Sequence, residues 1–244
     1  MDCLFVGQNI IELSSVDSTN NYLIDLSQRT SLVEGTIVIA KEQTAGRGQR
    51  NNFWSSESGK SLCISLLLKP KLDISQQFLF NKFIAVSLCQ ALNNYSLITK
   101  IKWPNDILIN RKKVAGILIE NSIRAGKIEK SVVGIGVNIN NNIGHIPKAT
   151  SIAEHIKTIP SIPQLLELIC KNFEKNYFLL KQKPLKIDEL YHLNFFQKGQ
   201  VQKFSKNGES FDGIINSVNE SGQLVLEVNG RFEFYNMGEI KFMI

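Results

Sequence analysis

Residues 100–120 read KIKWPNDILINRKKVAGILIE, two β-rich runs separated by a short polar turn. The runs are 106–109 and 114–120, and Asn110-Arg111-Lys112 lies between them. A connection this short joins antiparallel neighbours, because parallel strands need a crossover of a dozen or more residues. We therefore expect a mixed or antiparallel sheet and not a doubly wound parallel one.

Further periodic segments lie on both sides of this hairpin. β-Rich runs occur at 36–41, 61–68, 100–103 and 131–139, and apolar residues recur at helical intervals at 19–27, 78–92, 161–180 and 186–195. Asp17-Ser18-Thr19 is a cap signal for the first helix, whose N-terminus offers an anion or amide site. Together these segments predict an α+β fold with a mixed, mostly antiparallel sheet and flanking helices.

The character of the sequence changes after Gln197. From residue 198 onward, short strand-like runs alternate with the turn pairs Asn207-Gly208, Ser221-Gly222 and Asn229-Gly230. This pattern is typical of small β-barrels. We expect two domains, a larger one at 1–197 and a small β-barrel domain at 198–244.

The composition fits a globular protein of the cytoplasm. The 244 residues are 43% hydrophobic, which is enough for one substantial core and a small additional domain. No apolar run reaches the ~18 residues of a membrane span, and Asp2 stands where a signal peptide carries basic residues. Cys3, Cys63, Cys89 and Cys170 stand singly in apolar surroundings, which predicts buried, reduced thiols.

Charge and histidine content narrow the chemistry. The net charge of +6 favours anionic ligands or acidic partners without requiring nucleic acid, since the basic residues are spread along the chain. The three histidines, His145, His155 and His192, lie far from paired acids or cysteines. We therefore expect charge placement, and not a nucleophilic triad or a metal cluster, to carry the chemistry.

A glycine-rich loop, QTAGRGQRNNFW at 43–54, lies between the first two β-rich runs. Its small residues let the backbone approach an anion, Arg47 and Arg50 can neutralise one, and Trp54 can stack on a purine. Two other nucleotide-binding patterns are rejected. Gly59-Lys60-Ser61 lacks the leading glycine of a P-loop and precedes a strand, and Gly134-Ile135-Gly136 opens no crossover helix.

The hairpin carries complementary charges. Lys102 and Asp106 flank Pro104, and the hairpin returns Lys113 to the same neighbourhood. A carboxylate that attacks the α-phosphate of ATP brings two anions together, so the protein has to neutralise and align them while magnesium takes the pyrophosphate. The sequence therefore indicates an adenylate-forming site.

These motifs resemble those of the biotin protein ligases, specifically the compact kind without an N-terminal DNA-binding domain. The resemblance covers essentially the whole chain. The matching motifs are Asp17–Asn20, Gln43–Trp54, Lys102–Asp106, Lys113–Glu120 and Gly134–Asn138. The resemblance implies a class II synthetase-like ligase domain followed by an SH3-like β domain. It also implies an enzyme that forms biotinyl-5'-AMP from biotin and ATP, then transfers biotin to a lysine of a biotin carboxyl carrier protein or domain, of the acetyl-CoA carboxylase type.

The resemblance assigns a role to each motif. Lys113 and Arg47 would be catalytic, and Asp106 would hold Mg²⁺. The residues expected to bind biotin are Ser18, Thr19, Asn20, Gln43, Gly46, Arg47, Gly48, Gln49, Lys113, Gly116 and Gly134. The residues expected to bind ATP are Arg50, Trp54, Lys102, Asn105, Asp106 and Asn138. The loop from Gly46 to Phe53 would become ordered on ligand binding and exclude water.

Two features depart from the family pattern. Gln49 and Asn51 stand where many members have arginine and glycine. Since Gln49 offers hydrogen bonds but no charge, Arg50 is expected to share the anion-holding role. Only about sixteen residues precede Asp17, too few for a helix-turn-helix module, so we expect no DNA binding and no repression.

Several alternatives remain at this stage. A lipoate ligase shares this architecture and reaction type, and a non-catalytic nucleic-acid binder would also fit the positive charge and the barrel-like tail. The protein is expected to be a monomer or a homodimer, and strand 131–139 is one candidate for a dimer seam by edge pairing. The C-terminal domain could position an acidic carrier, close over ATP, or serve as a structural lid.

Overall fold

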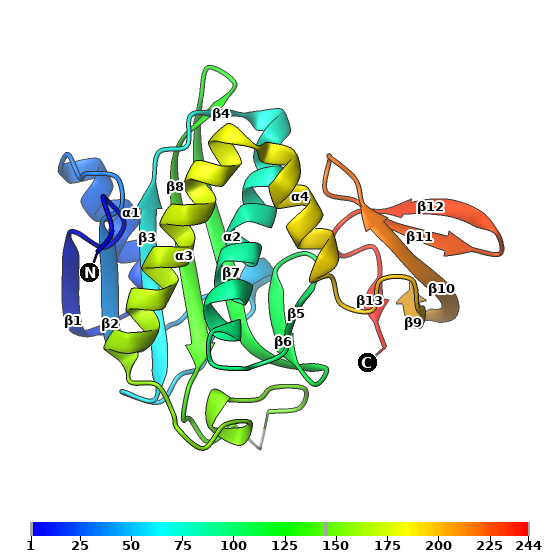
Figure 1. Ribbon diagram of the computed structural model, residues 1–244, viewed down its shortest axis with the longest axis horizontal. Coiled ribbons are helices and arrows are strands. Elements are labelled where there is room, and N and C mark those ends of the chain that lie inside the picture. Colours follow the sequence, from blue (N-terminus) through cyan, green and yellow to red (C-terminus); the bar gives the residue numbers. More distant parts are fainter. Residues whose placement is uncertain (1, 144–145, 244) are drawn as a thin grey trace.

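The computed structural model describes residues 2–143 and 146–243 and contains two β-sheets (Figure 1). The strands of the larger sheet are β1 (Ile10–Val16), β2 (Ile37–Gln43), β3 (Ser61–Leu68), β4 (Leu72–Asp73), β5 (Thr99–Lys102), β6 (Asp106–Ile109), β7 (Lys112–Arg124) and β8 (Lys127–Asn138). Their order is β1-β2-β3-β8-β7-β6-β5, and β4 pairs with β8. Of these pairings only β1 with β2 is parallel, which confirms the expected mixed, mostly antiparallel sheet.

Two successive tight turns build the centre of this sheet. Asn110 and Arg111 connect β6 to β7 with φ values of 47° and 68°, and Ala125 and Gly126 connect β7 to β8 with φ values of 48° and 73°. Two left-handed residues in a row form the turn whose twist matches antiparallel strands. The hairpin expected from residues 100–120 is confirmed, and β7 and β8 are longer than their sequence patterns indicated.

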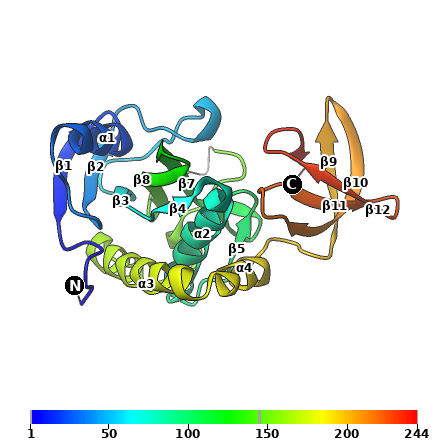
Figure 2. The same ribbon diagram turned by 90° about the horizontal axis from the view of Figure 1, so that it is seen from above.

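In the described part of the chain, four helices cover the two faces of the larger sheet. They are α1 (Thr19–Arg29), α2 (Gln77–Asn93), α3 (Ile162–Gln182) and α4 (Pro184–Leu193), and short 3-10 turns lie at Gln49–Asn51, Ile74–Gln76 and Ile152–Glu154. Figure 2 shows α1 on one face and α2, α3 and α4 on the other. α2 is buried along most of its length because its apolar residues face both the sheet and α3. All four expected helices are present, with ends shifted by at most two residues.

The C-terminal part forms a second antiparallel sheet. Its strands are β9 (Val201–Lys206), β10 (Glu209–Val218), β11 (Leu224–Val228), β12 (Arg231–Tyr235) and β13 (Lys241–Phe242), in the order β12-β11-β10-β9-β13. The small β-barrel expected from the sequence is thus observed as a second antiparallel sheet, in which, within residues 2–143 and 146–243, no ladder joins β12 to β13. The hydrophobic core runs continuously from α4 into this sheet through Tyr191 and Phe204. A domain boundary near Gln197 stays a prediction.

Two edges of the larger sheet differ from expectation. The sequence analysis did not identify β1, which forms one edge. Strand 131–139 was a candidate for edge pairing, but β8 lies between β3 and β7 with ladders on both sides, so that seam is wrong. β7 also has a long stretch without a strand partner on its β6 side, because among the described residues its ladder with β6 stops at Ala115.

Other expectations from composition can be checked directly. All four cysteines are buried and free, and burial raises the pKa of Cys89 to about 11. No helix in the described part of the chain is long and apolar enough to cross a membrane.

Candidate active site

A pocket of about 400 Å³ lies where the motif-bearing segments meet. Its walls come from the start of α1, the 43–54 loop, the 102–106 segment, strands β7 and β8, and the end of the C-terminal sheet. Every residue predicted for catalysis, biotin or ATP lines it except Gly46 and Asn138. Segments from Ser18 to Phe242 therefore converge on one pocket.

The start of α1 forms a buried polar end of the pocket. Ser18 occupies the N-cap position, so the cap signal correctly marked the start of the helix. Its side chain, however, makes no capping hydrogen bond. The Thr19 backbone N–H and hydroxyl both donate to Gln43 Oε1, at 2.8 and 3.1 Å. A hydrogen bond from Asn21 lowers the pKa of the neighbouring Asp17. Donors and acceptors are thus fixed around Ser18 and Thr19, which are 2% and 3% exposed.

Ser65 on β3 belongs to this polar end, although the sequence analysis did not identify it. Its hydroxyl lies 2.8 Å from Thr19 Oγ1 and 2.5 Å from Asn20 Oδ1, and it is fully buried. The Asn20 amide also donates to Glu120 Oε2 at 2.8 Å. A serine inside an otherwise apolar, wholly buried strand was the signal available in the sequence.

Glycines on β7 and β8 make room at the floor of the pocket. A Cβ at Gly134 would overlap the Asn20 side chain, and one at Gly136 would overlap the Trp54 indole. A Cβ at Gly116 would lie 3.0 Å from the Lys113 ammonium and 3.1 Å from the Trp54 ring. These glycines therefore allow polar and aromatic side chains to approach the sheet closely, as expected for strand glycines beside a site.

The 43–54 loop folds back on itself over the pocket. The Trp54 backbone N–H donates to the Gly46 carbonyl at 2.9 Å, and the Gly48 backbone N–H donates to the Asn52 carbonyl at 2.7 Å. Gly46 therefore supports the base of the loop and does not line the pocket, while Gly48 and Gln49 do line it. Arg50, with φ of 55°, places its guanidinium against Gly238 of the C-terminal sheet. Ordering of this loop by ligands stays a prediction.

Two cations in the pocket face carboxylates of the protein itself. Arg47 pairs with Glu120 at 2.9 Å, and Lys113 pairs with Asp106 at 2.6 Å. The Lys113 ammonium also lies 5.8 Å from the centre of a Trp54 ring. Glu120 belongs to one of the matching motifs, but no role was predicted for it, because its contact with Arg47 spans 73 residues of sequence.

The 102–106 segment adds a third cation and a link to the C-terminal sheet. Burial lowers the pKa of Lys102, while the nearby negative charge of Asp106 acts in the opposite direction. The Lys102 ammonium lies 5.2 Å from the centre of the Phe242 ring. The Asn105 amide donates to the Ile117 carbonyl at 2.8 Å and so fixes the segment to β7. Four C-terminal residues outside the predicted site residues also line the pocket: Gly238, Ile240, Lys241 and Phe242.

One predicted ATP-binding residue, Asn138, lies outside the pocket lining. Asn138 is held away from the pocket, because its amide donates to the Thr150 carbonyl at 3.1 Å and its oxygen accepts from Asn141 at 3.0 Å.

His155 contacts Thr150 and His192 contacts Val218, while His145 lies outside the described residues. No group of three or more His, Cys, Asp or Glu that could hold a metal occurs within the described ranges. Asp106 alone would suit Mg²⁺ in this pocket, since that ion often takes one or two carboxylates together with substrate phosphates.

A family model and two relatives all relate this chain to biotin or lipoate ligases. The model of the biotin/lipoate A/B protein ligase family matches residues 12–138. The bifunctional ligase/repressor BirA of Bacillus subtilis is 31% identical over 234 residues, covering 92% of this chain and 71% of that protein. The biotin--[acetyl-CoA-carboxylase] ligase of Paracoccus denitrificans is 36% identical over 130 residues, covering 52% of this chain and 53% of that protein.

A solved structure extends the similarity to the fold. The biotin protein ligase from Aquifex aeolicus in complex with biotin and ATP is similar with a TM-score of 0.80 and 26% identity, covering 96% of this chain and 98% of that chain. The match to the BirA protein of Escherichia coli, by contrast, covers 54% of this chain and only 41% of that protein, at 31% identity.

Proposed function

The chain belongs to the biotin/lipoate A/B protein ligase family, and we propose that it is an ATP-dependent biotin protein ligase. In the first step the biotin carboxylate attacks the α-phosphate of ATP, giving biotinyl-5'-AMP and pyrophosphate. In the second step a lysine amine of a biotin carboxyl carrier domain attacks the acyl carbon and releases AMP.

The observation that supports this proposal best is the convergence of Arg47 and Lys113 in one pocket. Biotin carboxylate and ATP repel each other, and fixed cations reduce that repulsion most where charge develops in the transition state. Lys113 is the leading catalytic residue because the β6–β7 hairpin fixes it at the meeting point of the loop and the 102–106 segment. Arg47, from the loop, would hold the carboxylate or the phosphate from the other side.

The polar end of the pocket suits the ureido ring of biotin. A urea group both donates and accepts hydrogen bonds, and groups of both kinds occur there on the buried residues Ser18, Thr19 and Asn20 and on the partly exposed Gln43. The dithiolane of lipoate offers no comparable hydrogen bonds to these polar groups, so this end of the pocket suits it less well. We therefore favour biotin over lipoate, which remains the alternative substrate.

The opposite end of the pocket suits ATP. Lys102, Arg50 and Lys241 supply positive charge, and Trp54 offers an aromatic face for adenine. Asp106 would hold Mg²⁺, which supplies charge neutralisation at the departing pyrophosphate. Because C-terminal residues line this end, the second sheet fits a role in closing the ATP side.

The direct test is incubation with radiolabelled ATP and biotin, followed by chromatography for a biotin-dependent acyl nucleotide. We expect labelled biotinyl-AMP with biotin, and little or no product with lipoate. Product with lipoate alone would favour a lipoate ligase. Salt-sensitive nucleic-acid binding together with no acyl nucleotide would favour the non-catalytic binder.

The second step needs a protein acceptor. We propose a biotin carboxyl carrier domain of the acetyl-CoA carboxylase type, on the grounds of the relatives' names. Transfer of labelled biotin to a purified carrier domain, but not to its Lys→Arg variant at the acceptor lysine, would support this acceptor. A cytoplasmic location, where ATP and carriers are available, is part of the same proposal.

A further inference from the structure

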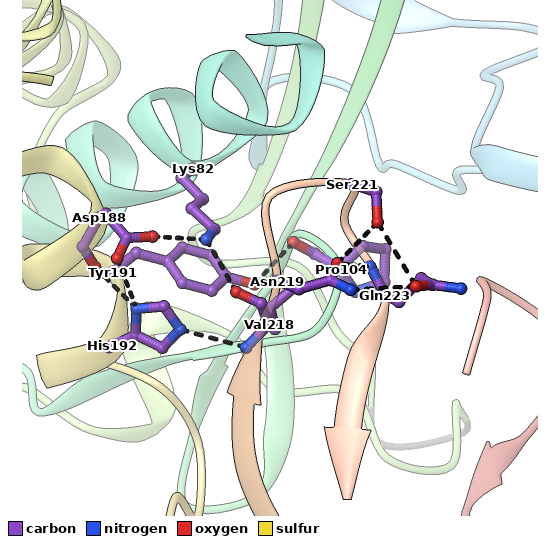
Figure 3. A network of polar contacts seen from close by, with 9 residues as sticks. All are labelled: Lys82, Pro104, Asp188, Tyr191, His192, Val218, Asn219, Ser221 and Gln223. Atoms are coloured by element: carbon purple, nitrogen blue, oxygen red, sulfur yellow. Dashed lines mark hydrogen bonds and ion pairs between the residues drawn. The ribbon is translucent and has the colours of Figure 1, made fainter. Parts of the chain in front are cut away.

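A buried lysine joins the helical layer to the C-terminal sheet (Figure 3). Lys82 on α2 is 3% exposed, and its ammonium donates to Asp188 Oδ1 on α4 at 2.5 Å and to the Val218 carbonyl at 3.1 Å. A buried ammonium is costly unless it is paired and hydrogen-bonded. Lys82 therefore favours one position of the end of β10 relative to α2 and α4.

His192 holds the same residue of β10 from its other side. The Val218 N–H donates to His192 Nε2 at 3.1 Å, while His192 Nδ1 lies 3.0 Å from the Asp188 carbonyl and 3.3 Å from Asp188 Oδ2. Since Nε2 accepts, the ring proton belongs on Nδ1 and the imidazole is neutral. Both backbone groups of Val218 are thus satisfied by side chains of the helical layer.

The turn that follows Val218 reaches the active site. The Asn219 side chain closes this turn by accepting the Gln223 N–H at 2.9 Å, and the Gly222 carbonyl accepts the Trp103 indole N–H at 2.9 Å. The Tyr191 hydroxyl, beside His192, donates to the Pro104 carbonyl at 3.2 Å. Trp103 and Pro104 lie between Lys102 and Asp106, so the network ends at the backbone that carries two pocket residues.

We propose that Lys82, Asp188 and His192 are positioning residues for the ATP-dependent step. They fix the 218–223 turn, which in turn fixes Trp103 and through it Lys102 and Asp106. Among the described residues no hydrogen bond joins this network to α1 or β3, which form the biotin end. The assignment to the ATP step rests on the proposed function, whereas the mechanical link from Val218 to Trp103 does not.

The same geometry makes the link depend on pH. A proton on His192 Nε2 would face the Val218 N–H and remove the acceptor. The charged groups around His192 are Asp188 on its own helix, Lys82 on α2 and Lys198 beyond α4. Burial, the largest cause, lowers the pKa of His192, with both lysines acting in the same direction and Asp188 against it. The link is therefore intact above the ordinary histidine value of about 6.5 and is lost as pH falls through the lower value in the folded protein.

Nuclear magnetic resonance tests the link without any assay of activity. The chain has two tryptophans, Trp54 and Trp103, so ¹⁵N-tryptophan labelling gives two indole signals, assigned with Trp54→Phe. We expect the Trp103 signal to shift between pH 8 and pH 5 in the wild type but not in His192→Gln, whose side chain accepts from Val218 without titrating. A Trp103 signal that is insensitive to pH, or that shifts equally in both proteins, would overturn the link.

Pyrophosphate exchange tests the positioning role. For Lys82→Met and His192→Leu we expect the KM for ATP to rise about tenfold while the KM for biotin stays within about twofold, because only the ATP side is displaced. His192→Gln should restore the wild-type KM for ATP. Lys186→Met is the matched control, since Lys186 makes an exposed ion pair with Glu189 on the same helix.

The outcomes separate the two proposals. An unchanged KM for ATP in folded Lys82→Met and His192→Leu would overturn the positioning role. An equal rise in the KM for ATP and the KM for biotin would also overturn it, because equal changes indicate general destabilisation of the protein. If Lys82→Met does not fold, the KM for ATP in His192→Leu compared with that in His192→Gln tests the positioning role. A wild-type protein without biotin-dependent exchange would refute the proposed function instead, and the Trp103 signal would still test the link.

Discussion

Arg47 and Lys113 are held in the pocket by carboxylates of the protein, Glu120 and Asp106. A cation whose position is already fixed needs less rearrangement when charge develops in a transition state. Lys113 is fixed by both the Asp106 pair and the neighbouring Trp54 ring. At the scale of single residues, these pairs make the two predicted catalytic side chains preorganised.

Replacing Lys113 with alanine should raise the barrier to adenylate formation by about 2 to 4 kcal/mol, the usual effect of removing one preorganised electrostatic donor. Biotin-dependent pyrophosphate exchange measures this change. Lys112→Ala is the matched control, because Lys112 is the exposed neighbour on the same strand. Rates within twofold of each other for the two variants would remove Lys113 from the catalytic role.

Ser65 provides a second prediction at this scale. Ser65→Ala would leave the Asn20 oxygen without the hydroxyl 2.5 Å away, so biotin affinity should fall by about 1 to 3 kcal/mol. Isothermal titration with biotin gives the comparison. Ser61→Ala is a close control, since Ser61 is buried on the same strand and its hydroxyl has no hydrogen-bond partner in the part of the chain that the structure describes. Equal affinities in both variants would refute the role of Ser65.

Most residues of the predicted motifs line the pocket, but the contacts that hold them in place could not be predicted from the motifs. Lys102, Asp106 and Lys113 could be placed together because a short hairpin connects them in sequence. Ser65 and Glu120 could not, because their partners on α1 and the loop come from segments 45 to 100 residues away. Asn138 was assigned to ATP from its motif alone, and its contacts with Thr150 and Asn141 become visible only in three dimensions.

At the scale of elements, periodicity predicted the helices and the central strands well. α2 is a long, mostly apolar segment that is buried along most of its length, and the β6–β7 hairpin has clear turn residues. β1 was missed because its IIELSSV sequence alternates only weakly and its residues are mostly partly exposed. The inner position of β8 also could not be predicted, since its order in the sheet depends on long-range pairing with β3.

The β7–β8 turn allows a test of this element's stability. Ala125 adopts φ of 48°, a conformation that costs most residues about 1 kcal/mol or more but that asparagine tolerates well. Ala125→Asn should therefore stabilise the protein by about 0.5 to 1 kcal/mol, raising Tm by roughly 1 to 4 °C. Ala125→Val, with a branched side chain at the same φ, should lower Tm. If Ala125→Asn lowered Tm and Ala125→Val raised it, or if both changed Tm equally, the left-handed conformation of this turn would be contradicted.

At the scale of the whole molecule, the two sheets share one core. Tyr191 of α4 and Phe204 of β9 belong to the same buried cluster, and Lys82 bonds to Val218 across the junction. The sequence suggested two domains because the turn pairs after Gln197 differ from the preceding helical pattern. A change of pattern marks a change of architecture, but it does not report how much surface the two parts bury against each other.

This shared core leads to the last prediction. Calorimetry should show one unfolding transition with equal calorimetric and van't Hoff enthalpies, because neither part can open without exposing the other's apolar surface. Phe204→Ala, which removes a fully buried ring from the second sheet, should destabilise by about 3 to 5 kcal/mol and shift the entire transition. Phe232→Ala on β12, where the ring is 59% exposed, is the control and should have little effect. If Phe204→Ala instead separates an early, small transition from an unchanged main one, residues 198–243 unfold independently and the boundary near Gln197 divides two thermodynamic domains.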